Sequence, residues 1–166
     1  MLDLNVDILL VRDLDSTISS REVEAVKEFI NSSTKDFHIM RDHPNHQKPI
    51  MGGLFGVKLT GSSRQKYEKI LMTVLSDQEH SRAPRSQRDH DQFLLTKHFW
   101  PEVRNDALMH DSYTCQNYWN TQPFPTQREK NTVGNFVGAI LYKGQKVPKP
   151  CPKQCRPYNH QDWDLC

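Results

Sequence analysis

Two aspartates near the start of the chain, Asp13 and Asp15, directly follow an apolar run and are separated by one residue. Residues two apart in an extended chain point to the same side, so both carboxylates can face one ligand. Carboxylate oxygens suit Mg2+ or Mn2+, and such ions commonly take one or two protein carboxylates together with substrate phosphates. The pair predicts a divalent metal site for a phosphate-bearing substrate, with a solvated strand end as the plainer interpretation.

The same stretch fits a second chemistry. The letters DLDST match the D-x-D-x-T pattern of haloacid dehalogenase-like phosphatases, which follows an early apolar strand. In that interpretation Asp13 is a nucleophile, Asp15 a general acid and Thr17 a phosphate contact. Such enzymes need a later acidic pair after another apolar strand, and the best later stretch, LMHDSY, offers one carboxylate beside a histidine. The phosphatase interpretation therefore ranks second.

The elements that must position these groups alternate between strands and helices, which indicates an α/β fold. The apolar run at 6–11 predicts a strand buried on both faces. Ser19 and Glu22 predict a capping box that opens a helix with Val23, Val26 and Ile30 on its inner face. We expect the later elements to be a strand at 37–40, a glycine-marked turn or strand at 51–56, a helix at 67–75, a loop at 76–91, a helix at 91–100 stopped by Pro101, and a strand at 135–142.

A resemblance to a known family rests on the block from residue 12 to residue 56 and on the later stretches DQFLL, HDSYTC, PFPTQR and NFVGAI. These elements, in this order, resemble poorly characterised glycosyltransferases of the GT-A, D-x-D type. The resemblance implies transfer of a sugar from a nucleoside diphosphate donor to a glycan, lipid or protein acceptor, with Mn2+ or Mg2+ as cofactor. It also implies a partial GT-A-like, Rossmann-like mixed sheet with flanking helices, in which Asp13 and Asp15 contact ribose, metal and diphosphate.

The resemblance implies further site residues. His110 is the candidate third metal ligand, because acids alone leave the ion incompletely ligated and such enzymes often add a histidine. Arg41, Asp42 and His43 lie in a polar loop after the second predicted strand, where Arg41 would contact the diphosphate and the histidine the sugar or acceptor. An ordinary charged turn closed by Pro44 is the alternative. A surface position is the alternative for His110.

Two glycines and one acid complete the predicted site. Gly52 and Gly53 would let the backbone approach the donor sugar closely, although they equally suit a plain turn. Asp91 resembles the acid that many such enzymes place near the transferred sugar. If the reaction inverts the anomeric carbon, Asp91 would be the general base.

Composition restricts the partners. The net charge of the 166-residue chain is +2, so no nucleic-acid partner is expected, and no apolar run reaches the roughly 20 residues of a membrane span. Four cysteines (Cys115, Cys151, Cys155 and Cys166) would form two disulfides in a secretory lumen or a zinc site. The sequence leaves the compartment open: the Golgi lumen if the source is an animal, the cytoplasm otherwise.

The chain is expected to divide into a catalytic portion at 1–143 and an irregular tail at 144–166, since four prolines in the tail exclude regular structure from most of it. Only about a dozen residues precede Asp13, room for one strand. The GT-A arrangement has several strand–helix units before its D-x-D motif, so we expect an N-terminal portion to be missing and the isolated chain to have little activity. A binding module without turnover is a further alternative, because it would need the same acids.

Overall fold

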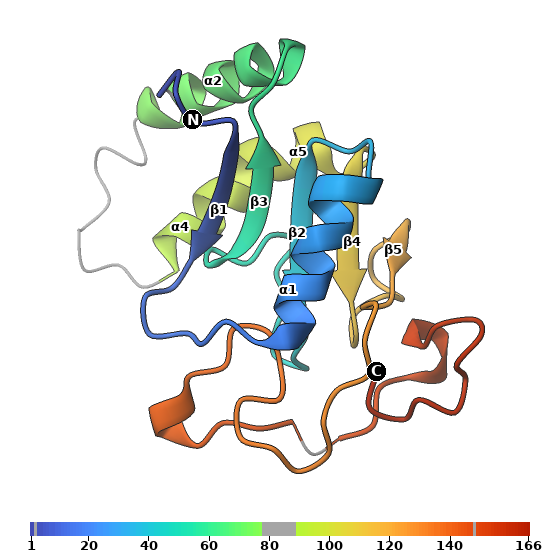
Figure 1. The fold of residues 1–166 in the computed structure, drawn as a ribbon. Coiled ribbons are helices and arrows are strands. Elements are labelled where there is room, and N and C mark those ends of the chain that lie inside the picture. Colours follow the sequence, from blue (N-terminus) through green and yellow to red (C-terminus); the bar gives the residue numbers. More distant parts are fainter. Residues whose placement is uncertain (2, 78–88, 148) are drawn as a thin grey trace.

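The computed structural model describes residues 1, 3–77, 89–147 and 149–166. They form an open five-stranded mixed sheet in the order β1-β3-β2-β4-β5, flanked by helices (Figure 1), which confirms the predicted α/β class. The strands are β1 (Ile8–Arg12), β2 (Phe37–Arg41), β3 (Leu54–Lys58), β4 (Ala107–Asp111) and β5 (Thr121–Gln122). Strand β3 runs antiparallel to the others, so the carboxyl ends of β1, β2 and β4 lie at the same end of the sheet.

Helices cover both faces of the sheet. Helix α1 (Ser20–Lys27) and the π-helical turn η1 (Glu28–Ser32) lie over β2 and β4 on one face (Figure 1). The other face packs against α2 (Ser62–Leu75) and a second helix made of α4 (His90–Leu94), the π-helical turn η2 (Leu95–Phe99) and α5 (Trp100–Val103). The main core lies between these helices and the sheet, and it contains Phe37, Ile39, Val57, Tyr67, Leu95, Val103 and Met109.

The predicted helix end at Pro101 is wrong, because the helix continues to Val103. Proline interrupts a helix by lacking an amide donor, but in the first turn of a helix that donor is not needed. Pro101 lies in the first turn of α5, directly after the π-helical turn. Most of the loop predicted at 76–91 falls on residues 78–88, which lie outside the described residues.

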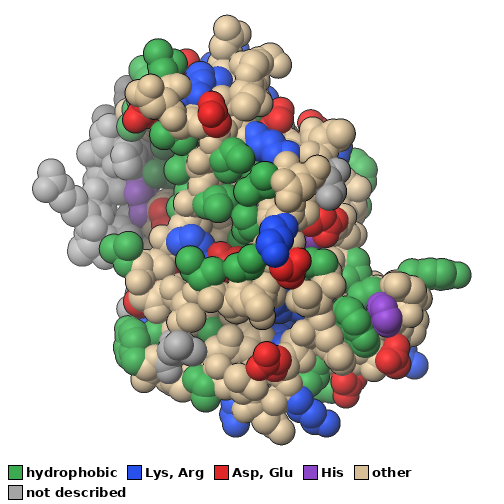
Figure 2. Space-filling model, viewed as in Figure 1, with side chains coloured by type: hydrophobic (Ala, Val, Ile, Leu, Met, Phe, Trp, Pro, Cys, Tyr) green, Lys and Arg blue, Asp and Glu red, His purple; other side chains and the backbone are tan. Residues whose placement is uncertain are grey.

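Strand β1 is an edge strand rather than a strand buried on both faces. Leu9 and Val11 pack against the main core, whereas Ile8 and Leu10 are 37% and 43% exposed. Among the described residues β1 pairs only with β3, and α1 lies over other strands. Hydrophobic side chains consequently gather on the surface over β1 and β3 (Figure 2).

The first helix begins at the predicted N-cap but turns a different face inward, and the Glu22 carboxylate pairs with Arg12 in place of closing the predicted capping box. Ser19 is its N-cap, and its hydroxyl accepts a hydrogen bond from the Glu22 amide at 3.2 Å. Val23 and Ile30 were expected inside, yet each is 38% exposed. The buried face instead carries Arg21, Glu22, Ala25 and Phe29. Both charged members of this face form ion pairs, which allows them to be buried.

The strand predicted at 135–142 is absent from the structure. This segment is irregular and ends in a 3-10 turn, η3 (Leu141–Lys143). Gly138 has a φ angle of 87°, which is outside the range of β-strand residues. The segment packs on the loop after β1, where the Thr17 amide donates to the carbonyl of Ala139 at 3.1 Å.

Residues 144–166 contain one 3-10 turn, η4 (Lys153–Cys155), within the described part of the tail. Two disulfides, Cys115–Cys155 and Cys151–Cys166, attach the tail to the segment after β4 and close it on itself. Within the described ranges, no helix has both the length and the apolar character that a membrane crossing requires.

Candidate functional site

The turn at Gly52 and Gly53 lies against two aspartates from distant parts of the chain. A methyl group built on Gly53 would lie 2.5 to 2.7 Å from the carboxyl atoms of Asp13. A methyl group built on Gly52 would collide with Oδ2 of Asp91. These distances are too short for any real side chain, so both carboxylates lie directly on the backbone of the turn. Three of the predicted site elements therefore meet here: Asp13, the two glycines and Asp91.

The sheet register explains why Asp13 reaches this turn. Arg12 of β1 pairs with Leu54 of β3 in the antiparallel ladder. One residue further in each direction, Asp13 faces Gly53 across the end of the same ladder. Directly opposed residues in an antiparallel pair have Cβ positions about 4.5–5.5 Å apart, so a carboxyl group one bond beyond the Cβ of Asp13 can reach the backbone of Gly53.

Asp91 reaches the same turn from the first turn of α4. Its neighbour Gln92 fixes this position: with its amide oriented to satisfy both groups, it donates to the carbonyl of Ile50 at 2.8 Å and accepts from the Gly52 amide at 2.7 Å. Asp13 and Asp91 are both exposed. Two carboxylates that are open to solvent on one turn can bind a cation or exchange protons with a ligand.

Asp15 turns toward a different segment. The hydroxyl of Tyr142 donates to its Oδ2 at 3.4 Å, and Ser16 Oγ donates to the carbonyl of Gly138 at 3.3 Å. The loop that carries Asp15 is thus attached to residues 138–142 beside the glycine turn. Asp15 is exposed, as Asp13 is.

The structure does not bring His110 to the two aspartates. Its side chain is fully buried, and its Nδ1 lies 2.8 Å from Nε2 of His38, while its Nε2 lies 3.2 Å from Oε2 of Glu28. Strand β4 is separated from β1 by β3 and β2, about 14 Å at the usual strand spacing. The predicted set of three metal ligands is therefore not assembled. Across the described residues, no group of three or more His, Cys, Asp or Glu side chains could hold a metal ion.

The His38–His110–Glu28 chain is instead part of the buried interior under α1. The ring of Phe29 stacks on His38 with centroids 4.9 Å apart. Burial first, then His110 and Lys58, lowers the pKa of His38 well below 6.5, so that this side chain is neutral in the fold. The hydrogen bond from His110 is the main cause that lowers the pKa of Glu28.

Arg41 was predicted to contact the diphosphate, with Asp42 beside it in a polar loop, but both are fully buried. The guanidinium of Arg41 donates to Asp111 and to the carbonyl of Pro49, each at 2.6 Å, and it lies 4.0 Å from the ring centroid of Tyr118. All these contacts are internal to the protein. We therefore assign both residues a structural role in place of the predicted ligand contact.

Asp42 is the centre of a buried ion cluster. Arg21 donates to its carboxylate at 2.8 and 3.1 Å, Ser112 at 2.7 Å and the amide of Val137 at 2.9 Å, and Arg128 donates to it as well. Burial alone would raise the pKa of Asp42, but the two arginines outweigh burial and the pKa is lowered. Asp42 is consequently ionised and holds α1, β4 and the segments at 128 and 137 together.

His43 and His46 lie partly buried beside this cluster. The ring of His43 packs on Phe136, with centroids 4.6 Å apart. His46 Nδ1 accepts the amide hydrogen of Asp42 at 3.2 Å. Burial, followed by the neighbouring His43, lowers the pKa of His46 from 6.5 to about 4. The ring of His43 contacts Phe136, His46 and the amide of Asn45, which all lie apart from the two aspartates of the glycine turn.

Two functional features were not found by sequence reasoning. Arg21 and Arg128 are the buried cations of the Asp42 cluster, and neither was singled out. A signal for Arg21 does exist, because Arg21, Ala25 and Phe29 are spaced four apart and therefore share one helix face. No comparable local signal marks Arg128.

Comparison with known proteins gives no match: neither a protein-family model, nor a curated protein, nor a solved structure resembles the chain closely enough to be recognised.

Proposed function

We propose that the chain is a metal-dependent glycosyltransferase, or part of one, that transfers a sugar from a nucleoside diphosphate donor. The observation that supports this proposal is the meeting of Asp13, the Gly52–Gly53 turn and Asp91. These groups are the ones that the sequence assigns to metal binding, sugar approach and proton transfer. They come from three distant parts of the sequence, and the register of β1 on β3 together with the start of α4 brings them to one turn.

Asp13 and Asp15 would hold Mn2+ or Mg2+ in this proposal. Their carboxylates are exposed oxygen donors on one loop, which fits such an ion, and phosphate oxygens of the donor would complete its ligand shell. When bound, the ion supplies a positive charge that stabilises the departing diphosphate.

Asp13 and Asp91 would act on the sugar. Their carboxylates occupy the space that side chains on Gly52 and Gly53 would fill, so the sugar would contact the solvent-exposed side of these carboxylates. Asp91 would accept the proton of the attacking acceptor hydroxyl if the reaction inverts the anomeric carbon. The acceptor would be a glycan, a lipid or a protein.

The first experiment tests metal and nucleotide binding. We expect Mn2+ to bind weakly alone and more tightly with UDP or GDP, in calorimetric titrations of the whole chain. Gly53→Ala forces a methyl group into the space of the Asp13 carboxylate, so it should weaken nucleotide-dependent metal binding about as much as Asp13→Asn does. Asp7→Asn, an exposed acid before the same strand, is the matched control. Equal binding by the wild type and Asp13→Asn would refute the metal role.

The second experiment measures sugar transfer from a panel of nucleotide sugars with Mn2+. Asp91→Asn should lower kcat at unchanged metal affinity, whereas Asp89→Asn should leave both unchanged. Binding without turnover would indicate a non-catalytic sugar-nucleotide module. Beryllofluoride attached to Asp13, detected by fluorine NMR, would favour the phosphatase chemistry instead.

A further inference from the structure

A small cavity of about 130 Å3 lies at the N-terminus of α1, away from the glycine turn. Its wall includes Ser20 and Arg21 from the helix and Thr126, Arg128 and Glu129 from the segment that follows β5. Apart from Gly134, the residues on this wall have polar or charged side chains, and Arg21 and Arg128 belong to the buried ion cluster of Asp42. The kind of ligand that fits the cavity depends on the charge of these residues, on their hydrogen-bond donors without acceptors, and on the volume of the cavity.

Positive charge exceeds negative charge in the buried cluster behind the cavity. Arg21 and Arg128 are only 4% and 3% exposed, and they share the single carboxylate of Asp42. Glu129 also lines the cavity, but it is exposed at the rim. Uncompensated charge is costly to bury, so an anion in this cavity would relieve the excess.

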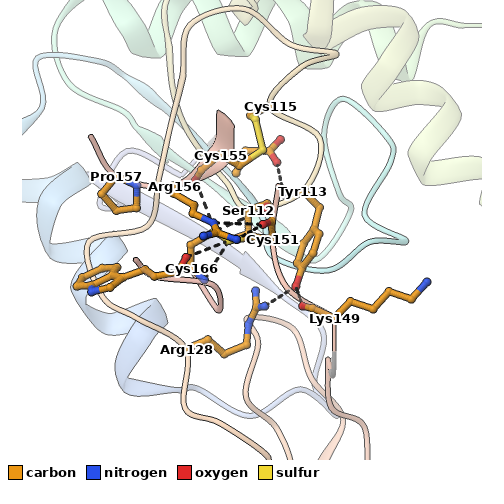
Figure 3. Close-up of a disulfide and its surroundings, with 12 residues drawn as sticks. Ser112, Tyr113, Cys115, Arg128, Lys149, Cys151, Cys155, Arg156, Pro157 and Cys166 are labelled. Atoms are coloured by element: carbon orange, nitrogen blue, oxygen red, sulfur yellow. Dashed lines mark hydrogen bonds between the residues drawn. A yellow bond between two sulfur atoms is a disulfide. The ribbon is translucent and has the colours of Figure 1, made fainter. Parts of the chain in front are cut away.

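Two buried polar atoms on the cavity residues lack hydrogen-bond partners among the described residues: Nε of Arg128 and Oγ1 of Thr126. The other two guanidinium nitrogens of Arg128 have acceptors. Its Nη1 donates to the Tyr113 hydroxyl at 2.7 Å, as Figure 3 shows, and its Nη2 donates to Asp42. Buried polar groups are almost always hydrogen-bonded. An unpaired guanidinium nitrogen and an unpaired hydroxyl, on two residues that line the same cavity, therefore indicate a missing acceptor.

The helix supplies further donors. Ser19 accepts the amide hydrogens of Glu22 and Val23, through its side chain and its carbonyl. The amides of Ser20 and Arg21 belong to the first helical turn, where N–H groups have no acceptor within the helix. The dipole of the helix adds partial positive charge at this end.

We propose that this cavity binds a tetrahedral oxyanion, either a free phosphate or sulfate ion or the terminal phosphate or sulfate group of a larger ligand. Helix N-termini and arginine side chains are the usual ligands of such groups. The volume suits one group of this kind and is well below the roughly 300 Å3 at which pockets for larger ligands begin. The inference is independent of the proposed transferase activity.

The test uses thermal unfolding and calorimetry of the whole chain in metal-free buffer. Phosphate and sulfate should stabilise the protein saturably relative to chloride at equal ionic strength. A nucleoside diphosphate and a sugar phosphate, added in separate titrations of Asp13→Asn, distinguish a free ion from a group on a larger molecule. Tighter binding than that of inorganic phosphate identifies the larger ligand, and weaker binding identifies the free ion.

Matched substitutions assign the binding to this cavity. Ser20→Pro removes one amide donor, and proline is well tolerated at the first helical position because Ser19 before it is extended. Ser20→Ala keeps the amide. Thr126→Val removes the unpaired hydroxyl, and Thr126→Ser keeps it. We expect at least a fivefold loss of phosphate affinity in Ser20→Pro and Thr126→Val, and no loss in the two controls.

Two results would overturn the proposal. One is the absence of any saturable effect of phosphate or sulfate on the wild-type protein. The other is unchanged phosphate affinity in folded Ser20→Pro and folded Thr126→Val, which would mean that the ion binds elsewhere. If a variant fails to fold, the wild-type titration and the other substitution still decide the question.

Discussion

Acidification should destabilise this fold through His46. The imidazole is mostly buried beside His43 and Phe136, and its Nδ1 accepts the backbone amide hydrogen of Asp42. That hydrogen bond requires a neutral acceptor. The pKa of His46 falls from 6.5 to about 4 on folding. As the pH falls, the unfolded chain therefore binds a proton on His46 near pH 6.5, whereas the folded protein does not bind it until about pH 4.

The magnitude follows from these two pKa values. The contribution of neutral His46 to the free energy of unfolding is fully present above pH 6.5 and is lost progressively as the pH falls toward 4. Between pH 7.5 and pH 5.0 the free energy of unfolding should decrease by about 2 kcal/mol from His46 alone. The pKa of His38 is lowered in the same direction, so the contribution of His46 must be isolated by substitution.

The assay is urea unfolding at both pH values in phosphate-free buffer, comparing the wild type with His46→Asn. The asparagine Oδ1 can accept the Asp42 amide hydrogen in place of Nδ1, and it does not titrate. The loss of stability between pH 7.5 and pH 5.0 should be about 2 kcal/mol smaller in the variant. An equal loss in both proteins would show that His46 does not resist protonation and that the reasoning is wrong.

Three further predictions concern stability, each measured by urea unfolding at pH 7.5. Asp42→Ala leaves two buried arginines without their counter-charge and should cost about 3–5 kcal/mol, whereas Glu24→Ala at an exposed ion pair should cost less than about 0.5 kcal/mol. Replacing Cys115 and Cys155 with serine should cost about 4 kcal/mol, because that disulfide closes a loop between residues 40 apart; an unchanged midpoint would contradict this. Gly61→Ala should cost at least about 1 kcal/mol through backbone strain alone, since φ is 53° there and no atom lies within 4 Å of the added methyl group.

Several elements could be predicted from the sequence because short-range patterns specify them. The strand at 37–40, the turn and strand at 51–56 and the helix around 67–75 are present where apolar spacing placed them. Ser19 caps α1 because the capping bond joins residues three apart. The two aspartates after the first strand could be selected in the same way, since acid pairs at strand ends are visible locally.

Other features depended on partners that the sequence does not reveal. Apolar spacing placed Val23 inside, but Arg21 occupies the inner face because Asp42 and Ser112 are there to receive it. His110 was predicted as a metal ligand, but its strand faces α1, where His38 and a glutamate bind it. The charge or polarity of a side chain does not tell which buried partner will satisfy it.

The sequence by itself determined which groups can do chemistry at this site, because the choice of carboxylates and glycines is a matter of residue type. Tertiary structure alone decided which of them meet. The register of β1 against β3 places Asp13 on Gly53, and the bond between Gln92 and Gly52 brings Asp91 to the same turn. Both contacts join segments about 40 residues apart, and hydrogen bonds and packing between such segments are fixed only when the whole sheet and its helices assemble.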